Sequence, residues 1–190
     1  MKIALSAIGR ALPGHASPDA GFEAPFDMLT TCHERVHRML RLLGRLQTHL
    51  AEVGWDPQAA DAARDVLRYF DLAAPLHHED EERHVFPPLL AQGDERVCTA
   101  VRQLQADHQR MESSWPAVRA LLHSVAQADG CAAWAGWDAT AQATLTTFRN
   151  LYLAHIPLEE SLVYPAAQGV LDADALQAMS AEMQARRRAR

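Results

Sequence analysis

Apolar side chains recur at spacings of three and four residues through most of the chain, which is the pattern of amphipathic α-helices. The pattern is clearest from Met28 to Leu50, where arginines occupy the other faces. It predicts four long helices, over residues 26–53, 57–90, 95–127 and 132–166, and a shorter helix from about residue 172. No segment of useful length alternates apolar and polar residues as a strand would, so the fold class is all-α.

Helix ends are marked by residues with unusual backbone preferences. Gly54 is a natural stop, and Asp56-Pro57 is an N-cap followed by proline at the first helical position. Pro75 and Pro157 fall inside the second and fourth helices, where each removes a backbone hydrogen bond and predicts a kink. Four long helices joined by short turns favour an up-down-up-down antiparallel four-helix bundle.

The bundle accounts for residues 25–168, and the two ends of the chain differ from it. Residues 1–24 are rich in Pro, Gly, Ala and Ser, which predicts an N-terminal arm without long regular elements. Residues 169–190 predict a short C-terminal helix with a frayed basic tail, Arg186 to Arg190, rather than a binding patch. The 190 residues fit one domain, and 48% of them are hydrophobic, which is ample for its core.

Charge and cysteine usage exclude several classes of partner. The formal net charge of -6 argues against a nucleic-acid groove and against an anionic membrane surface. Cys32, Cys98 and Cys131 are widely spaced, which suits neither a disulfide framework nor a zinc knuckle and favours a reducing compartment. No run approaches the ~18 apolar residues of a membrane span, so the expected location is the cytoplasm. No feature of the sequence indicates an oligomeric state.

A histidine followed four residues later by a glutamate occurs twice within the same eleven-residue pattern. The pattern begins at His77 and again at His155, continues through a second glutamate and closes with an aromatic-Pro pair. Residues four apart lie on the same face of a helix. His77 with Glu81, and His155 with Glu159, therefore each present an imidazole and a carboxylate to one partner, and a metal ion fits that pair best.

Two further histidines stand ahead of these segments. His33 and His108 are 75 residues apart, and each has a polar companion four residues on, His37 and Glu112. A single such pair is usually a hydrogen-bonded pair on a helix surface. Four pairs in register predict instead a metal site in the bundle centre, built by two duplicate hairpins that face each other around a pseudo-two-fold axis. Glu112 and His37 are additional candidate ligands.

The ligand types narrow the choice of metal. Imidazole and carboxylate without thiolate suit iron or manganese, and zinc less well. A structural zinc ion has four ligands, commonly cysteine. Four histidines and two glutamates are too many for one tetrahedral ion, and predict two octahedral ions about 3.5 Å apart with bridging carboxylates. The two glutamates also balance positive charge in a low-dielectric core.

His33 and His37 share a helical face, and the first turn serves as a ruler to separate them. His77 lies 22 residues after Trp55 and His33 lies 22 before it, whereas His37 lies only 18 before it. Residues equally far from the turn of an antiparallel hairpin lie at the same height. Four residues correspond to about 6 Å along a helix, so His33 is the predicted ligand, and His37 is predicted to contact the metal centre only from behind its ligands.

Other polar and aromatic residues receive supporting roles. Residues one position from a predicted ligand point about 100° away, so they are expected to contact the ligands from outside or to face solvent; these are His78, Glu82 and Glu160. Core aromatics with a satisfied polar tip are expected at Tyr152, Tyr164 and Trp115.

A ferritin-like di-iron bundle is a rival interpretation, because that architecture uses Glu on two helices and Glu-x-x-His on the other two. Glu34-x-x-His37 and Glu81-x-x-His84 match the string. They fall on adjacent helices of one hairpin, however, and leave three of the predicted histidine ligands unused. The ferritin-like interpretation therefore ranks behind.

The order of the motifs resembles the hemerythrin-like, or HHE cation-binding, family over residues 26–166. It consists of a His, then His-x-x-x-Glu with a following Phe-Pro, then a His, then His-x-x-x-Glu with a following Tyr-Pro. The resemblance implies a four-helix bundle around a non-haem centre of two iron ions with an oxo or hydroxo bridge. By position it implies terminal imidazoles from His33, His77, His108 and His155, and bridging carboxylates from Glu81 and Glu159.

One departure from the oxygen-carrying hemerythrins bears on function. Those proteins have His-x-x-x-His on the third helix and His-x4-Asp on the fourth, where this chain has His108-x-x-x-Glu112 and His155-x-x-x-Glu159. The pattern is more similar to relatives that repair iron centres after nitrosative stress or sense iron. The expected function is binding of a small diatomic ligand or peroxide for sensing, detoxification or iron-centre repair. The alternative is a non-enzymatic iron-binding or iron-sensing module, and the residues leave open whether the protein is an enzyme.

Overall fold

A computed structural model describes residues 24–130 and 134–188, and these residues are helical with no strand among them. The predicted arm, except for residue 24, lies outside them, and the division of the chain into arm, bundle and C-terminal helix stays a prediction. The elements are α1 (Pro25–Glu52), α2 (Pro57–Asp80), η2 (Glu81–Val85), α3 (Phe86–Gln92), α4 (Glu95–Ala126), α5 (Ala139–Leu158), η4 (Glu159–Val163), α6 (Tyr164–Val170) and α7 (Ala173–Arg188).

The long helices α2, α4 and α5 begin at aspartate caps. The side chains of Asp56, Asp94 and Asp138 each accept a hydrogen bond from a backbone N–H three residues on, which satisfies a group that the first helical turn leaves open. α2 begins at Pro57, as the sequence predicts. α5 begins at Ala139 rather than near residue 132, because the cap at Asp138 defines its first turn and Gly136, just before it, has a positive φ of 84°.

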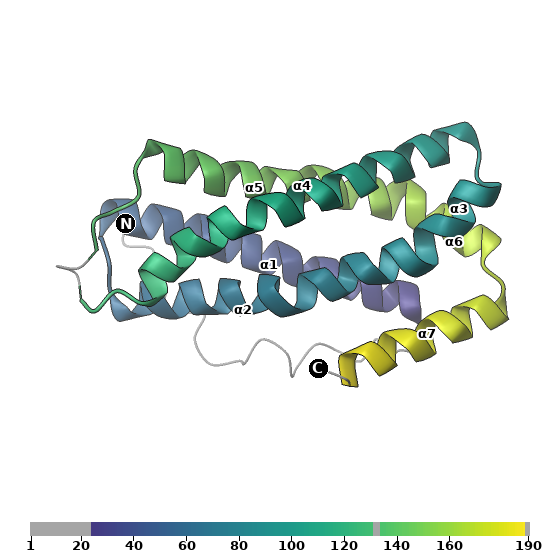
Figure 1. Cartoon of the computed structure of the whole chain (residues 1–190), viewed down its shortest axis with the longest axis horizontal. Coiled ribbons are helices and arrows are strands. Elements are labelled where there is room, and N and C mark those ends of the chain that lie inside the picture. The colour runs from purple at the N-terminus through teal and green to yellow at the C-terminus, as the bar shows by residue number, and fades with distance from the viewer. Residues whose placement is uncertain (1–23, 131–133, 189–190) are drawn as a thin grey trace.

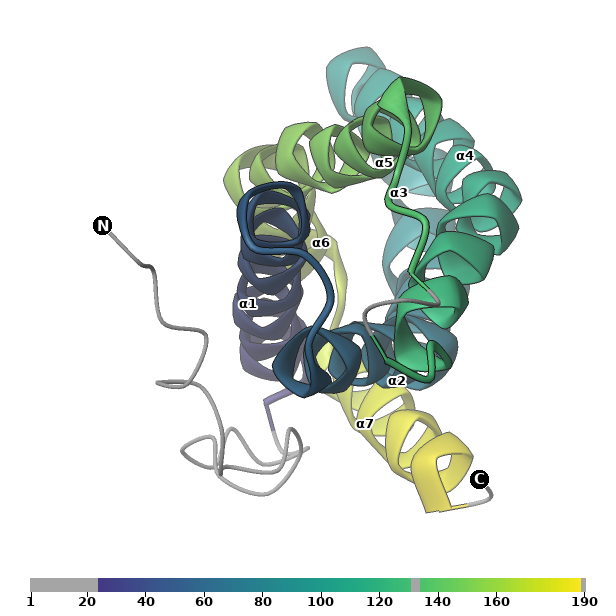
Figure 2. The ribbon, with the colours of Figure 1, turned by 90° about the vertical axis from the view of Figure 1, so that its left-hand side faces the viewer.

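The helices α1, α2, α4 and α5 pack side by side into a helical bundle (Figure 1), and the end-on view shows them arranged around a common axis (Figure 2). α1 packs on α2, α2 on α4, α4 on α5, and α5 on α1. α7 lies outside this group against α2 and α1 (Figure 2).

The buried apolar side chains form two clusters with a polar layer between them. One cluster takes residues 36–50 of α1, 59–74 of α2, 111–125 of α4 and 145–156 of α5. The other joins the start of α1 and α4 to α3, α6 and α7, and includes Phe86 and Met183. On each long helix the histidines that the sequence singles out fall at the boundary of the two clusters, so the fold itself buries them.

Two π-helical segments, η2 and η4, interrupt the helices at matching points. They begin at Glu81 and Glu159, and a backbone hydrogen bond from the residue five positions later closes each wide turn. α2 and α5 remain α-helical through Pro75 and Pro157, and the kinks expected at these prolines stay predictions. Both prolines are exposed, so water can satisfy the carbonyl that loses its helical partner. Single π turns inside helices are frequent at functional sites.

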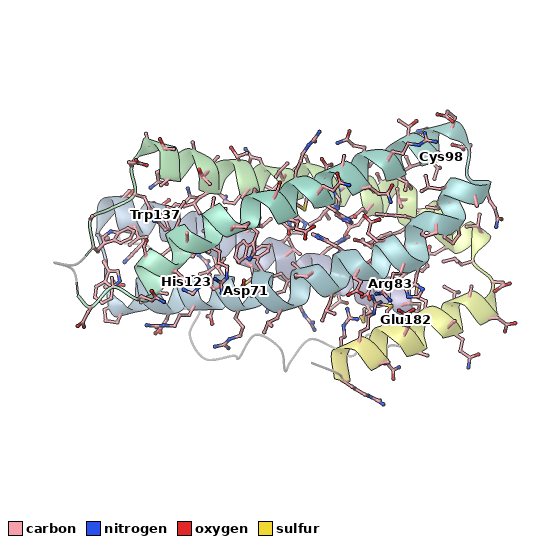
Figure 3. All side chains as sticks on the ribbon, in the orientation of Figure 1. Asp71, Arg83, Cys98, His123, Trp137 and Glu182 are labelled. Atoms are coloured by element: carbon pink, nitrogen blue, oxygen red, sulfur yellow. The ribbon has the colours of Figure 1, made fainter. Side chains whose placement is uncertain are left out.

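The C-terminal helix is anchored, and the prediction of fraying is wrong for Arg186 and Arg187. Both guanidinium groups pair with the fully buried carboxylate of Asp80, at 2.6 Å for Arg187. Arg83 of η2 adds a 2.8 Å ion pair to Glu182 of α7, and the two side chains meet in Figure 3. The basic residues therefore hold α7 onto the end of α2. No helix in the described ranges is long and apolar enough to cross a membrane.

Candidate metal centre

Six side chains predicted as ligands converge between the two apolar clusters. Their ligand atoms form two overlapping groups, and within each group all atoms lie within 4.8 Å of one another. We call these groups site A and site B, and Glu81 and Glu159 belong to both. Site A consists of His33, His77, Glu81 and Glu159, and site B consists of Glu81, His108, His155 and Glu159.

In site A, α1 contributes one imidazole and α2 the other. His33 Nε2 lies 3.1 Å from a carboxylate oxygen of Glu159, and His77 Nε2 lies 3.5 Å from one of Glu81. His77 and Glu81 are four residues apart across the junction of α2 and η2, so they share a face as the sequence predicts. In site A, Glu159 therefore lies beside an imidazole of the opposite hairpin, and Glu81 lies beside an imidazole of its own hairpin.

Site B repeats this arrangement on α4 and α5. His155 Nε2 lies 2.7 Å from Glu159 Oε1, and His108 Nε2 lies 3.4 Å from Glu81 Oε2. The Nε2 atoms of His108 and His155 are 3.1 Å apart. Two imidazole nitrogens this close, with both glutamates beside them, form a compact set of donor atoms.

Several atoms of this set are buried without a hydrogen-bond partner. They include Oε2 of Glu81, both carboxylate oxygens of Glu159 and Nδ1 of His77, and both glutamates have 0% exposure. Leaving a buried polar group unpaired costs roughly 1–3 kcal/mol, and more when the group is charged. Donor atoms that meet one another but lack partners fit a metal ion bound among them.

Electrostatics support the same conclusion. Burial, together with the neighbouring Glu81, raises the pKa of the Glu159 carboxyl to about 8. At Glu81 burial is outweighed by His77 and the other imidazoles, which lower the pKa of its carboxyl well below the ordinary value. Two adjacent buried carboxyls resist ionising together, and a cation between them removes that conflict.

The histidines are prepared for ligation in two ways. Burial lowers the pKa of His77 to about 3 and that of His155 to about 4, which favours the neutral imidazole that binds metals. At His108 burial is outweighed by hydrogen bonds to Glu81 and Glu82, which raise its pKa to about 9. A metal ion that takes the place of the proton on Nε2 would lie beside Glu81, while Glu82 keeps its contact with Nδ1.

Comparisons with known proteins agree with this geometry. The family model described as the Hemerythrin HHE cation binding domain matches residues 24–167. The chain belongs to the hemerythrin HHE family. An uncharacterized protein of Haemophilus influenzae is 30% identical over 168 residues, which cover 88% of this chain and 92% of that protein. Family membership and the two clusters together support cation binding at this place in the hemerythrin HHE domain.

Two glutamates outside the sites accept hydrogen bonds from the far side of the His33 and His108 rings. His33 Nδ1 donates to Glu160 at 2.9 Å, and His108 Nδ1 donates to Glu82 at 2.9 Å. A carboxylate only accepts hydrogen bonds, so each contact places the ring proton on Nδ1 and leaves Nε2 free to face the metal. His78 also contacts the centre from outside, since its ring stacks on His108 with centroids 4.1 Å apart.

Tyr164 belongs to the site, although its sequence context suggests a core aromatic. Its hydroxyl donates to Glu81 Oε1 and lies 3.2 Å from His33 Nε2. Burial and the two neighbouring glutamates raise the pKa of this phenol well above its ordinary value, so it stays protonated. The aromatic-Pro pair that closes the eleven-residue pattern is the signal for it, because this pair is Phe-Pro in one copy and Tyr-Pro in the other.

Asp107 is a second residue that the sequence analysis missed. Its carboxylate lies 3.7 Å from His155 Nδ1, within ion-pair range but too far for a hydrogen bond, and it accepts hydrogen bonds from Gln103 and Arg110. Its position immediately before His108 is the only sequence signal. Asp107 therefore adds negative charge behind the imidazole of His155 in site B.

The remaining candidates lie outside both sites. Glu112 is exposed, and His37 is half-buried and makes no hydrogen bond or ion pair with any described residue. The ferritin-like alternative does not assemble either, because Glu34 is exposed and His84 pairs with Glu182 at 2.9 Å. The structure thus brings together the six principal candidates and neither of the two additional ones.

Proposed function

We propose that this protein holds two iron ions, one in site A and one in site B, with Glu81 and Glu159 as bridging carboxylates. The observation that carries the proposal is that two buried donor groups share both glutamates. A single tetrahedral ion would leave half of the imidazoles unused. Imidazole and carboxylate donors without thiolate suit iron, with manganese and zinc as second choices.

The terminal ligands in this proposal are His33 and His77 on one ion and His108 and His155 on the other. The lowered pKa values of His77 and His155, and the hydrogen bonds that hold His33 and His108 from behind, support it. The proposed scaffold is an up-down-up-down antiparallel four-helix bundle, which is supported by the packing of each long helix on its neighbour along the chain.

We further propose that the ligand is a small diatomic molecule or peroxide, for sensing, detoxification or iron-centre repair. Each site offers four donor groups, which are two imidazoles of its own and the two shared carboxylates. Six-coordinate iron has more positions than these four donors fill when each gives one atom. When bound, the pair of iron ions, bridged by an oxo or hydroxo group, would supply redox chemistry and open positions for such a ligand. The protein's own part is to fix the imidazoles, exclude bulk water and keep the Tyr164 proton beside Glu81.

A non-enzymatic iron-binding or iron-sensing role is the second candidate. It is favoured by the anchoring of α7, because Asp80, which binds Arg186 and Arg187, stands directly before the bridging residue Glu81. Metal occupancy could in this way be coupled to the position of the C-terminal helix. In this role the iron content would change the fold stability without turnover of a small ligand.

Anaerobic reconstitution with ferrous iron, followed by elemental analysis, tests the metal assignment. Close to two iron ions per chain are expected. One zinc ion per chain, or no metal after reconstitution, contradicts the proposal. The variants Glu81→Ala and Glu82→Ala form a matched pair, because they are adjacent and only the first removes a donor shared by both sites.

Addition of oxygen or nitric oxide to the reduced protein separates the two candidate roles. New charge-transfer absorption with turnover supports the chemistry of a small ligand. Stoichiometric iron with an unchanged spectrum supports a binding or sensing module.

A further inference from the structure

A cavity of about 520 Å³ lies between α2 and α4, beside site B. One wall carries aromatic rings, and His78 and His108 form the part nearest the metal centre. A water molecule takes about 30 Å³ in the liquid, so the space far exceeds the need of a diatomic ligand or peroxide. Its volume falls within the range of sites for small organic molecules, about 300–1,000 Å³.

The aromatic wall is rigid. Phe70, Trp115, Phe148 and Tyr152 line the cavity, and their neighbouring ring centroids are 5.2–5.6 Å apart. The indole N–H of Trp115 donates to Asp71 at 2.9 Å, and Asp71 lies on α2 near its crossing with α4 (Figure 3). A preorganised wall of this kind binds an apolar or aromatic body with little loss of side-chain entropy.

The polar side of the cavity is acidic. Three glutamates line it, Glu79, Glu82 and Glu112, and no lysine or arginine does. Glu79 is paired with Arg83, and Glu82 accepts from His108 and Gln105. Glu112 makes no hydrogen bond or ion pair with any residue that the structure describes. The cavity therefore carries one unpaired carboxylate, Glu112, and no lysine or arginine in its lining to pair with it.

We propose that this cavity binds a small organic amine with an apolar or aromatic body. The body packs on the aromatic wall, and the ammonium group donates to Glu112 at the rim. The aromatic faces also attract a cation, while an organic anion of the same size meets three carboxylates and no lysine or arginine. This ligand site goes beyond the proposed iron chemistry and touches the metal centre only through the outer face of His108.

Calorimetric titration of the iron-loaded full chain tests the proposal with two probes of similar size, 2-phenylethylamine and 3-phenylpropionate. The amine is expected to bind at least about tenfold more tightly than the carboxylate. Glu112→Gln should remove most of this preference. Equal binding of the two probes, or a preference for the carboxylate, overturns the proposal.

Two blocking variants and a matched control locate the binding. Gln109 is exposed on α4 and lines the cavity, whereas Ser113 is exposed on the same helix and does not. Gln109→Trp should abolish amine binding, and Ser113→Trp should leave it unchanged. Ala74→Leu fills the cavity from α2 and should also abolish binding, which keeps the test valid if Gln109→Trp fails to fold. Amine binding that survives in a folded blocking variant contradicts the assignment.

Iron content, measured on the same samples, separates this proposal from the proposed function. If the reconstituted protein binds the amine but contains no iron, the di-iron assignment is contradicted and the cavity assignment is supported. Two iron ions per chain without saturable amine binding up to millimolar concentration overturn the cavity assignment alone.

Discussion

The hairpin α1–α2 and the hairpin α4–α5 present the same types of candidate metal-binding donor but surround them with different neighbours. His33 corresponds to His108, 75 residues later, and Glu81 corresponds to Glu159, 78 residues later. In both hairpins the first histidine donates its Nδ1 proton to a glutamate of the opposite hairpin at 2.9 Å. The repeat is therefore kept in the donor atoms and in the contacts that fix their tautomers.

The outer contacts break the repeat. Tyr164 places a hydroxyl against His33, whereas the corresponding Phe86 offers His108 only a ring, with centroids 5.6 Å apart. Asp107 stands behind His155, whereas the corresponding position behind His77 is Cys32, and His77 Nδ1 has no hydrogen-bond partner.

The cavity adds a third difference, because it lies on the side of site B. It is lined by His78 and Trp115, and the residues at the corresponding positions of the other half are Ile156 and Leu40. Because similar donors have different surroundings, we expect sites A and B to differ in their affinity for a metal ion and in how easily a small ligand reaches them. We expect site B to bind its ion more tightly and site A to be the more enclosed position.

Removing a shared glutamate should have the largest effect, because it damages both halves at once. Glu81→Ala and Glu159→Ala are each expected to lose both ions. At an iron concentration ~1,000 times the dissociation constant, lost binding removes about 4 kcal/mol of stability per ion. Loss of both ions therefore removes about 8 kcal/mol, which for a chain of this size corresponds to roughly 20 °C in melting temperature. Calorimetry with iron present measures this shift.

Glu82→Ala and Glu160→Ala are the controls for the shared glutamates. Each removes one hydrogen bond to a histidine Nδ1 and should cost about 1 kcal/mol while both ions remain. If all four variants melt alike and keep their iron, the distinction between bridging and outer glutamates is wrong.

Removing one terminal histidine should empty one half only. His33→Ala is expected to lose the ion of site A and His108→Ala the ion of site B, so each variant should hold about one iron by elemental analysis. His37→Ala is the matched control for His33, since it lies on the same face of α1 outside both sites. Loss of an ion from His37→Ala with both ions kept in His33→Ala would reverse the assignment.

Asp107→Asn should weaken site B selectively. Neutralising a carboxylate behind a metal-binding histidine typically costs 10–100-fold in metal affinity, and the longer 3.7 Å contact here favours the lower end, about tenfold. A chelator competition that resolves two affinities checks this, with Asp61→Asn on the exposed face of α2 as the control. A tenfold change in the tighter site is expected to make the two affinities more alike.

The clustering of the six candidate donors could be predicted from the sequence because they repeat at helical spacing. A helix fixes which face i and i+4 share, so His77 with Glu81, and His155 with Glu159, followed from local geometry alone. The π turns at η2 and η4 were not predictable in this way, since the backbone departs there from the regular period. Asp107 and Tyr164 were missed for a related reason, because their contacts cross between helices and depend on packing that no periodic pattern encodes.

The smallest expected effect comes from the tyrosine that distinguishes the two halves. Tyr164→Phe removes the hydroxyl between Glu81 and His33 and makes the two aromatic-Pro pairs alike. The ring stays, so packing is kept, and the loss of one buried hydrogen bond should cost about 1 kcal/mol. Both ions are expected to remain, because Tyr164 is not among the six clustered donors. The change should appear in Mössbauer spectra, where the two iron signals become more similar. Phe86→Tyr is the reciprocal variant, and should shift the signal of site B while leaving that of site A in place. If Tyr164→Phe loses an iron ion instead, the hydroxyl is a ligand and the contrast between the two halves extends to the donors themselves.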